Sequence, residues 1–136
     1  MGTLSSNSRV KIHGKIVEGL REAHNFTQIS WVRKQFISKL FIDPYPGTLN
    51  LEIIDLESLQ VFKKLKATKG IEITPEDPSF CNAQCYPVLI NDRIKGAIVF
   101  PLVMNYPENK MELIASQKIK ETLSVKTGDI LEVEIL

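Results

Sequence analysis

Short stretches in which apolar and polar residues alternate recur along this 136-residue chain, and they limit its fold more than any other feature. Alternation with a period of two is typical of half-buried β-strands. The expected strands, six or so in number, fall within residues 10–17, 48–53, 71–73, 85–90, 94–101, 111–115 and 130–136, with a hairpin turn at Asn91 and Asp92. Short helices are expected at residues 30–40, 56–69 and 116–123. The pattern predicts a mainly β fold, a small six-stranded β-barrel with two or three short helices, because a sheet of this size hides its edges by closing.

Length and composition set the expected domain organisation and compartment. Hydrophobic residues make up 43% of the chain and charged residues 24%, which is the balance of an ordinary globular domain. We expect a flexible polar N-terminal tail at residues 1–9 and a single domain over residues 10–136. No apolar run approaches the ~20 residues of a membrane span, and the start of the chain lacks a signal pattern. The sequence therefore predicts a cytoplasmic protein, a monomer or weak homo-oligomer that does not act at a membrane.

The charge balance argues against a nucleic-acid partner. Seventeen Lys and Arg residues stand against sixteen Asp and Glu residues, a net charge of +1, whereas nucleic-acid binding needs a basic patch or stripe. The local basic cluster consists of Lys63, Lys64, Lys66 and Lys69, and a solvated helix face explains it. A DNA-binding dimer is therefore the least favoured of the functions that we consider.

The first expected helix begins where the apolar period changes from two to that of a helix. Ser30 is the expected N-cap, and Trp31, Phe36, Ile37 and Leu40 lie mostly on one face, which we expect to be buried. Trp31 is expected to anchor this helix in the core rather than to serve as a stacking platform for a ligand.

Two prolines and a glycine in residues 43–47 end this helix in a turn, and a strand follows directly. Alternation places Leu49 and Leu51 in the core, and Thr48 and Asn50 together on the opposite face. A hydroxyl and an amide oxygen ~7 Å apart along a strand are hard oxygen ligands that could share a Mg²⁺ ion completed by phosphate and water. The alternative is a solvent-facing pair at the start of an ordinary strand.

A second candidate site lies at the start of the last expected helix, where Ser116 is the expected N-cap. Free backbone N–H groups there favour an anion, and Lys118 and Lys120 add positive charge. A capped surface helix with solvated lysines is the alternative interpretation. Glu112, on the preceding strand, either projects beside a bound ligand or is merely exposed.

The cysteines do not indicate a metal site. Cys81 and Cys85 do not have a zinc spacing, and His13 and His24 lie far away in the sequence. We expect buried or half-buried free thiols, whose role the sequence leaves open. No nucleophile elbow, Walker loop or dinucleotide fingerprint is present, so the local chemistry alone does not decide the function.

Several longer strings of sequence resemble one known family. They are residues 14–19, 44–51, 96–101, 112–115, 118–121 and 126–129. In this order they resemble the archaeal CTP-dependent riboflavin kinase family over about residues 10–136, and the Pro-Tyr-Pro-Gly-Thr-Leu-Asn-Leu string of residues 44–51 is specific. The resemblance implies a cradle-loop β-barrel that transfers a phosphoryl group from CTP to the ribityl hydroxyl of riboflavin, giving FMN, with Mg²⁺ as cofactor.

The resemblance also implies the residues of the site. It places Mg²⁺ on Thr48 and Asn50, the pair that alternation puts on one face. The implied nucleotide contacts are Gly19, Leu20, Arg21, Glu22, Ala23, His24, Asn25, Gln117, Lys118, Ile119 and Lys120. The flavin side falls on Glu112 and on Met104, which stands at the position of a family threonine. No motif marks a catalytic base, so no catalytic residue is assigned.

The chain departs from the family in the loop after the first strand. The family reads Gly-x-Gly-Glu-Gly-Arg-Tyr there, whereas this chain keeps only the first glycine and the glutamate. Side chains now stand where bare backbone would approach phosphate, and Arg21 and His24 are candidates to contact phosphate by charge instead. We therefore expect a divergent member that phosphorylates riboflavin or a related small-molecule hydroxyl. The alternative is a non-catalytic nucleotide- or flavin-binding barrel.

Overall fold

The structure, a computed structural model, describes residues 10–19 and 26–136. The expected tail at residues 1–9 and the loop residues 20–25 lie outside the described part of the chain. The strands of the described part are β1 (Lys11–Val17), β2 (Leu49–Ile53), β3 (Ile71–Ile73), β4 (Ala83–Ile90), β5 (Ile94–Pro101), β6 (Lys110–Ala115) and β7 (Ile130–Ile135). The helices there are α2 (Ser30–Leu40), α3 (Leu56–Lys66) and α4 (Ile119–Leu123). Each expected element is present, and its ends differ from the prediction by no more than three residues.

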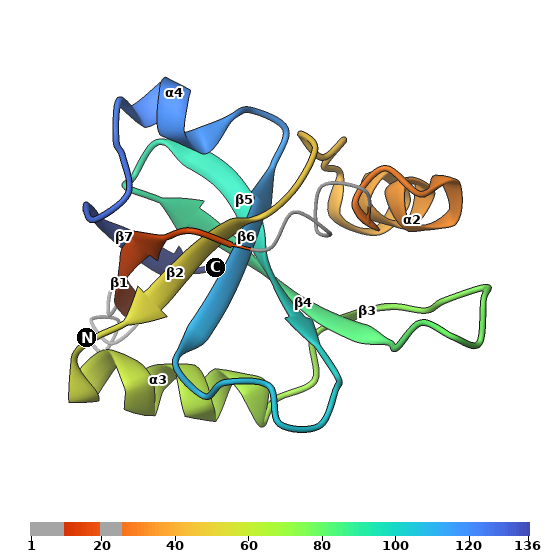
Figure 1. The fold of residues 1–136 in the computed structure, drawn as a ribbon, viewed down its shortest axis with the longest axis horizontal. Coiled ribbons are helices and arrows are strands. Elements are labelled where there is room, and N and C mark those ends of the chain that lie inside the picture. Colours follow the sequence, from red (N-terminus) through yellow and green to blue (C-terminus); the bar gives the residue numbers. More distant parts are fainter. Residues whose placement is uncertain (1–9, 20–25) are drawn as a thin grey trace, which may run out of the picture.

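The strands form one antiparallel sheet in the order β3-β4-β5-β6-β2-β1-β7. An additional pairing of β4 with β7, in which Val88 faces Ile135, closes six of the described strands into a barrel and leaves β3 outside it. Figure 1 shows the crossed strands with α3 below them and α4 above them. The predicted mainly β, six-stranded barrel is therefore confirmed for the part of the chain that the structure describes.

The barrel interior is filled by alternate side chains of its strands. Leu51, Ile98 and Val133 are each at most 1% exposed and belong to one buried cluster. The two helices at the ends add Phe62 from α3 and Ile119 from α4 to this cluster. Because full burial of one such side chain contributes roughly 1.5–3 kcal/mol, this interior is the main source of stability.

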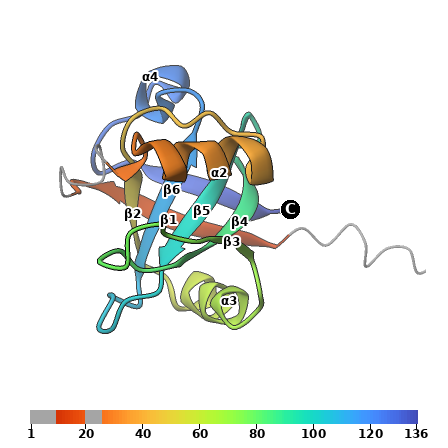
Figure 2. The ribbon, with the colours of Figure 1, turned by 90° about the vertical axis from the view of Figure 1, so that its right-hand side faces the viewer.

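The helix α2 covers the outer face of the sheet, as Figure 2 shows. Val32 and Phe36 are fully buried in a second cluster that includes Val99 of β5 and Ile114 of β6. The sequence predicts Ile37 on the buried face, but its side chain is 43% exposed, so that prediction is wrong. The sheet packs against the face of α2 that carries Val32 and Phe36, and this packing leaves Ile37 facing solvent.

Neither Ser30 nor Ser116 is the helix cap that the sequence predicts. The N-cap of α2 is Ile29 and that of α4 is Lys118, and neither makes a side-chain cap hydrogen bond. Before α2, a turn in which the Ile29 N–H donates to the Phe26 carbonyl already orders the chain, so the helix begins without a serine cap. Before α4, the chain is still leaving β6 at Ser116, and the helix starts three residues later.

Several turns use left-handed backbone conformations. Asn91 and Asp92 have φ values of 48° and 56° between β4 and β5, which confirms the predicted hairpin turn. Phe41, at the end of α2, has a φ of 59° although its side chain is bulky and 90% exposed. Such a conformation costs roughly 1–2 kcal/mol for a residue with a side chain.

Other predicted side-chain environments have mixed outcomes. Trp31 is half-buried at the edge of the cluster under α2 and packs edge-on against the exposed Phe80, with ring centroids 5.4 Å apart, so the predicted core anchor is only partly confirmed. Cys85 is buried, which raises the pKa of its thiol to about 12, but Cys81 is exposed rather than buried. Lys66 is half-buried and burial lowers the pKa of its ammonium, so it is not part of a solvated face, whereas the other three lysines of that cluster are exposed.

None of the helices within residues 10–19 and 26–136 has the length and apolar character needed to cross a membrane.

Candidate functional site

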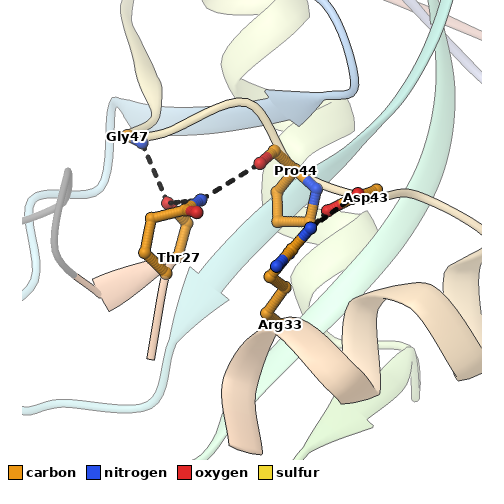
Figure 3. Close-up of polar contacts among 6 residues, drawn as sticks. Thr27, Arg33, Asp43, Pro44 and Gly47 are labelled. Atoms are coloured by element: carbon orange, nitrogen blue, oxygen red, sulfur yellow. Dashed lines mark hydrogen bonds and ion pairs between the residues drawn. The ribbon is translucent and has the colours of Figure 1, made fainter. Parts of the chain in front are cut away.

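The turn before β2 is held by side chains from the segment before α2. Gly47 has a φ of 94°, which favours glycine, and its N–H donates to the Thr27 hydroxyl at 2.9 Å. Thr27 is fully buried, and the amide of Gln28 donates to the carbonyl oxygen of Pro44 at 3.1 Å. Figure 3 shows these contacts around the turn. They fix the course of the backbone that leads into Thr48.

Two further contacts tie the same turn to its neighbours. Arg33 of α2 makes a two-point contact with Asp43, with N···O distances of 2.7 and 2.9 Å (Figure 3), and this guanidinium lowers the pKa of the Asp43 carboxyl. On the other side, the Tyr45 N–H donates to the carbonyl oxygen of Ala115 in β6 at 2.8 Å. The turn is thus anchored both to α2 and to the end of β6.

Thr48 and Asn50 lie together on the face opposite the core, as alternation predicts. Leu51 is buried in the barrel interior, and Leu49 packs against the same cluster. On the other face, the Thr48 hydroxyl donates to Oε1 of Glu112 at 2.9 Å. Asn50 pairs directly with Glu112 in the β2–β6 register. A hydroxyl, an amide and a carboxylate are therefore neighbours on two adjacent strands.

Tyr106, from the loop between β5 and β6, completes this group. Its hydroxyl donates to Oε2 of Glu112, so each oxygen of that carboxylate accepts one hydroxyl. Burial, together with the hydrogen bond to Glu112, raises the pKa of the Tyr106 hydroxyl above its ordinary value. The tyrosine consequently stays protonated and acts as a donor.

The chain that leaves β1 runs directly over Asn50, whose residue is 5% exposed. Val17 pairs with Asn50, and two residues later a Cβ built on Gly19 would come within 1.9 Å of Asn50 Nδ2. Real Cβ atoms essentially never come so close, so any side chain at this position would force the Asn50 amide or the backbone of Gly19 to shift. The loop that follows β1 therefore begins in contact with the side-chain amide of Asn50, a metal ligand predicted from the sequence.

A cavity of about 260 Å³ opens beside these residues. Its lining comes from the end of β1, the turn before β2, the end of β6 and the start of α4, and it includes Gly19, Thr48, Asn50 and residues 117–120. The volume is near the lower end of small-molecule pockets, which begin at about 300 Å³. Thr48 and Asn50 thus both line this cavity, although Asn50 is almost entirely buried beneath Gly19.

Charged side chains lie at the start of α4, where this cavity opens. Lys118 pairs with Glu121 at 3.1 Å, and this contact raises the pKa of the Lys118 ammonium. The Lys120 ammonium donates to the Thr127 hydroxyl at 3.3 Å, and that hydroxyl donates to Glu18 at 2.9 Å. All are surface contacts, so an anionic ligand could compete for both ammonium groups.

The structure brings together most, though not all, of the site residues nominated from the sequence. Gly19, Thr48, Asn50, Gln117, Lys118, Ile119 and Lys120 line the same cavity. Glu112 adjoins it through its contact with Thr48. Met104 does not line it: this side chain is 89% exposed on the loop between β5 and β6. Leu20, Arg21, Glu22, Ala23, His24 and Asn25 lie outside the described residues.

Sequence reasoning missed two residues that shape the site. Tyr106 is six residues from its partner Glu112, and its position in an irregular loop gave no periodic signal. Thr27 is a buried polar residue that follows Phe26 in the sequence. Nothing in the local pattern indicates that its hydroxyl accepts a hydrogen bond from the Gly47 N–H, twenty residues away. The only sequence signal for the first of these contacts is that Tyr106 lies six residues before Glu112.

The chemistry of the donors suits Mg²⁺. The Thr48 hydroxyl donates a hydrogen bond to Glu112, which leaves its oxygen lone pairs for a metal, and Asn50 adds an amide oxygen. Within the described residues, no group of three or more His, Cys, Asp or Glu side chains could hold a metal ion. A Mg²⁺ ion at Thr48 and Asn50 would therefore have only neutral oxygens from these two side chains, and substrate phosphate and water would complete its coordination.

Fold and site together define a class: a small antiparallel β-barrel with a cavity at one end, lined by oxygen donors and lysines. The family model of CTP-dependent riboflavin kinases, formally described as the domain of unknown function DUF120, matches residues 16–135. The chain belongs to this family.

Relatives named riboflavin kinase are similar over most of the chain. One from Archaeoglobus fulgidus is 38% identical over 130 residues, which are 93% of this chain and 55% of that protein. One from Methanosarcina barkeri is 33% identical over 129 residues, 93% of this chain and 56% of that protein. One from Sulfurisphaera tokodaii is 36% identical over 128 residues, 91% of this chain and 93% of that protein. The chain thus spans about half the length of some relatives and nearly the whole length of another.

Proposed function

We propose that this chain transfers the terminal phosphoryl group of CTP to the ribityl hydroxyl of riboflavin, giving FMN and CDP, with Mg²⁺ as cofactor. The observation that carries the proposal is the cavity in which Thr48 and Asn50 share one lining with the lysine-bearing start of α4. Membership of the CTP-dependent riboflavin kinase family, and relatives that carry the name riboflavin kinase, support the same activity.

The chemistry asks the protein for positioning more than for covalent participation. The bond between the γ-phosphorus and its bridging oxygen breaks, CDP leaves, and the phosphorus bonds to the ribityl oxygen while the hydroxyl proton is released. We assign Thr48 and Asn50 to Mg²⁺, which when bound would neutralise charge on the phosphate oxygens. Lys118 and Lys120 would hold the nucleotide's phosphates in exchange for their present surface partners. Together these groups would keep donor and acceptor in line.

The acceptor side of the proposal rests on Glu112 and on the loop between β5 and β6. Glu112 presents its carboxylate beside Thr48, where it could accept a hydrogen bond from the acceptor hydroxyl. Leu102, Val103 and Met104 expose a short apolar segment on that loop, and such a surface suits the flavin ring system. Met104 is therefore retained as a proposed flavin contact outside the cavity.

The direct test is product formation. Purified protein is mixed with riboflavin, Mg²⁺ and either CTP, ATP, GTP or UTP, and chromatography quantifies FMN. We expect most FMN with CTP, none without a divalent ion, and a loss of at least ~10-fold in rate for Asn50→Ala, because a metal ligand is removed. Asn82→Ala is the matched control, since that amide contacts Glu72 at 2.7 Å, outside the cavity lining, and it should keep the rate.

Two outcomes would contradict the proposal in different ways. Absence of FMN with all four nucleotides would remove riboflavin phosphorylation. Nucleotide binding without transfer, equally tight in wild type and Asn50→Ala, would favour the non-catalytic binding barrel, to which the changed loop at residues 19–25 also points.

A further inference from the structure

The carboxylate of Glu112 connects the candidate metal ligand Thr48 to a distant loop. Thr48 has one hydroxyl proton, and it is donated to Glu112 Oε1 at 2.9 Å. A threonine hydroxyl binds a metal through its oxygen lone pairs, so its proton must point away from the ion. The contact with Glu112 fixes that direction before any metal arrives.

Tyr106 controls where this carboxylate can lie. Its hydroxyl donates to the second oxygen of Glu112, while the Glu112 backbone is held in β6 opposite Asn50. The carboxylate therefore cannot turn away from Thr48 without giving up a charge-assisted hydrogen bond to the tyrosine. Thr48, Glu112 and Tyr106 form one chain of contacts.

The ring of Tyr106 is anchored independently of its hydroxyl. Phe100 meets it edge-on, with centroids 5.7 Å apart and planes at 76°, and the Lys110 ammonium lies 5.3 Å from the ring centroid. Removal of the hydroxyl alone should therefore leave the ring in place. Tyr106 also stands two residues after Met104, on the loop proposed to contact the flavin.

We propose that Tyr106 is a positioning residue for the metal ligand Thr48, that it acts through Glu112, and that it couples the loop between β5 and β6 to Mg²⁺ binding. The inference rests on the proposed function, since it requires a Mg²⁺–nucleotide complex at Thr48 and Asn50. Contact of an acceptor with this loop would change the affinity for Mg²⁺, and by reciprocity Mg²⁺ would change the affinity for the acceptor.

The test compares Tyr106→Phe with Tyr86→Phe. The Tyr86 hydroxyl also donates one partly buried hydrogen bond, to the carbonyl oxygen of Thr68 at 2.9 Å, but it is not among the residues that line the site. Isothermal calorimetry measures CDP binding at a series of Mg²⁺ concentrations, and thermal melts check that both variants fold. We expect Tyr106→Phe to need about 10-fold more Mg²⁺ for half-maximal binding, the lower limit for loss of a group that supports a metal ligand. Tyr86→Phe should match the wild type.

A double-mutant cycle separates this role from a general structural one. If Tyr106 acts through Glu112, Tyr106→Phe combined with Glu112→Gln should need no more Mg²⁺ than the worse single variant. A Mg²⁺ requirement unchanged in Tyr106→Phe, or effects that multiply in the double variant, would overturn the inference while leaving the proposed function standing. A wild-type protein whose CDP binding ignores Mg²⁺ would overturn the proposed function and this inference with it.

Discussion

Replacement of Gly19 by alanine should damage the site much more than the fold. The new Cβ would lie 1.9 Å from Asn50 Nδ2 and 2.6 Å from Asn50 Cγ, whereas real Cβ atoms essentially never approach within 3.0 Å. Either the amide or the loop must therefore move by about an ångström. Misplacement of a positioning group by about 1 Å can cost roughly 100-fold in rate, which corresponds to ~2.7 kcal/mol of transition-state stabilisation. We expect kcat/KM for FMN formation to fall by roughly 100-fold, and the Mg²⁺ concentration that gives half-maximal activity to rise.

Gly70→Ala provides the matched control for this experiment. Its Cβ would lie 2.6 Å from the backbone carbonyl oxygen of Cys85, also closer than the 3.0 Å that real Cβ atoms keep, at a position outside the lining of the site cavity. Overpacking of either kind costs roughly 1–3 kcal/mol of stability, so both variants should melt earlier than the wild type. Gly70→Ala should nevertheless keep the wild-type Mg²⁺ requirement at temperatures where it is folded. Wild-type kinetics for Gly19→Ala, or an equal kinetic loss in both variants, would refute the reasoning.

Three further predictions concern stability. Phe41→Gly should be more stable than Phe41→Ala by roughly 1 kcal/mol in urea unfolding, because only glycine relieves the left-handed backbone at φ 59°; equal stabilities would contradict this. Thr27→Val removes the acceptor of the Gly47 N–H and should lower the free energy of unfolding by about 1–3 kcal/mol. Thr68→Val removes an exposed hydroxyl and should lower it by less than ~0.5 kcal/mol; equal losses in the two variants would contradict a stabilising role for the buried contact. Burial raises the pKa of Cys85 to about 12 from an ordinary value near 9.0, so the folded state keeps its proton where the unfolded chain loses it. The free energy of unfolding therefore keeps this contribution in full below pH 9 and loses up to ~1.4 kcal/mol of it per pH unit as the pH rises toward 12. Urea unfolding across that pH range should show a smaller loss of stability per pH unit for Cys85→Ala than for the wild type.

Alternation along strands made the core of the fold and part of the site predictable. A strand has a side-chain period of two, so the assignment of Leu51 to the interior also assigned Thr48 and Asn50 to the other face. The turn residues before β2 and between β4 and β5 fixed where these strands begin and pair. Closure into a barrel followed because no other arrangement of a short antiparallel sheet covers its edges as well.

The features that the sequence did not reveal depend on contacts between distant segments. The helix α2 has apolar residues on more than one face, and only its contact with the sheet decides that Val32 is buried and Ile37 exposed. Tyr106 reaches Glu112, and Thr27 reaches Gly47, through irregular segments whose course no periodic pattern encodes. Ser116 predicts too early a start for α4, because a serine favours the N-cap position, whereas the helix begins after Lys118 without a side-chain cap.

The account depends most on the position of the metal ion, and crystals soaked with Mn²⁺ and CDP test it directly. Anomalous scattering locates Mn²⁺ without ambiguity from protein atoms. We predict a single strong peak within about 2.0–2.3 Å of both Thr48 Oγ1 and Asn50 Oδ1, in contact with the phosphates of CDP. A peak bound elsewhere, or bound nucleotide with no metal at these two side chains, would contradict the central claim.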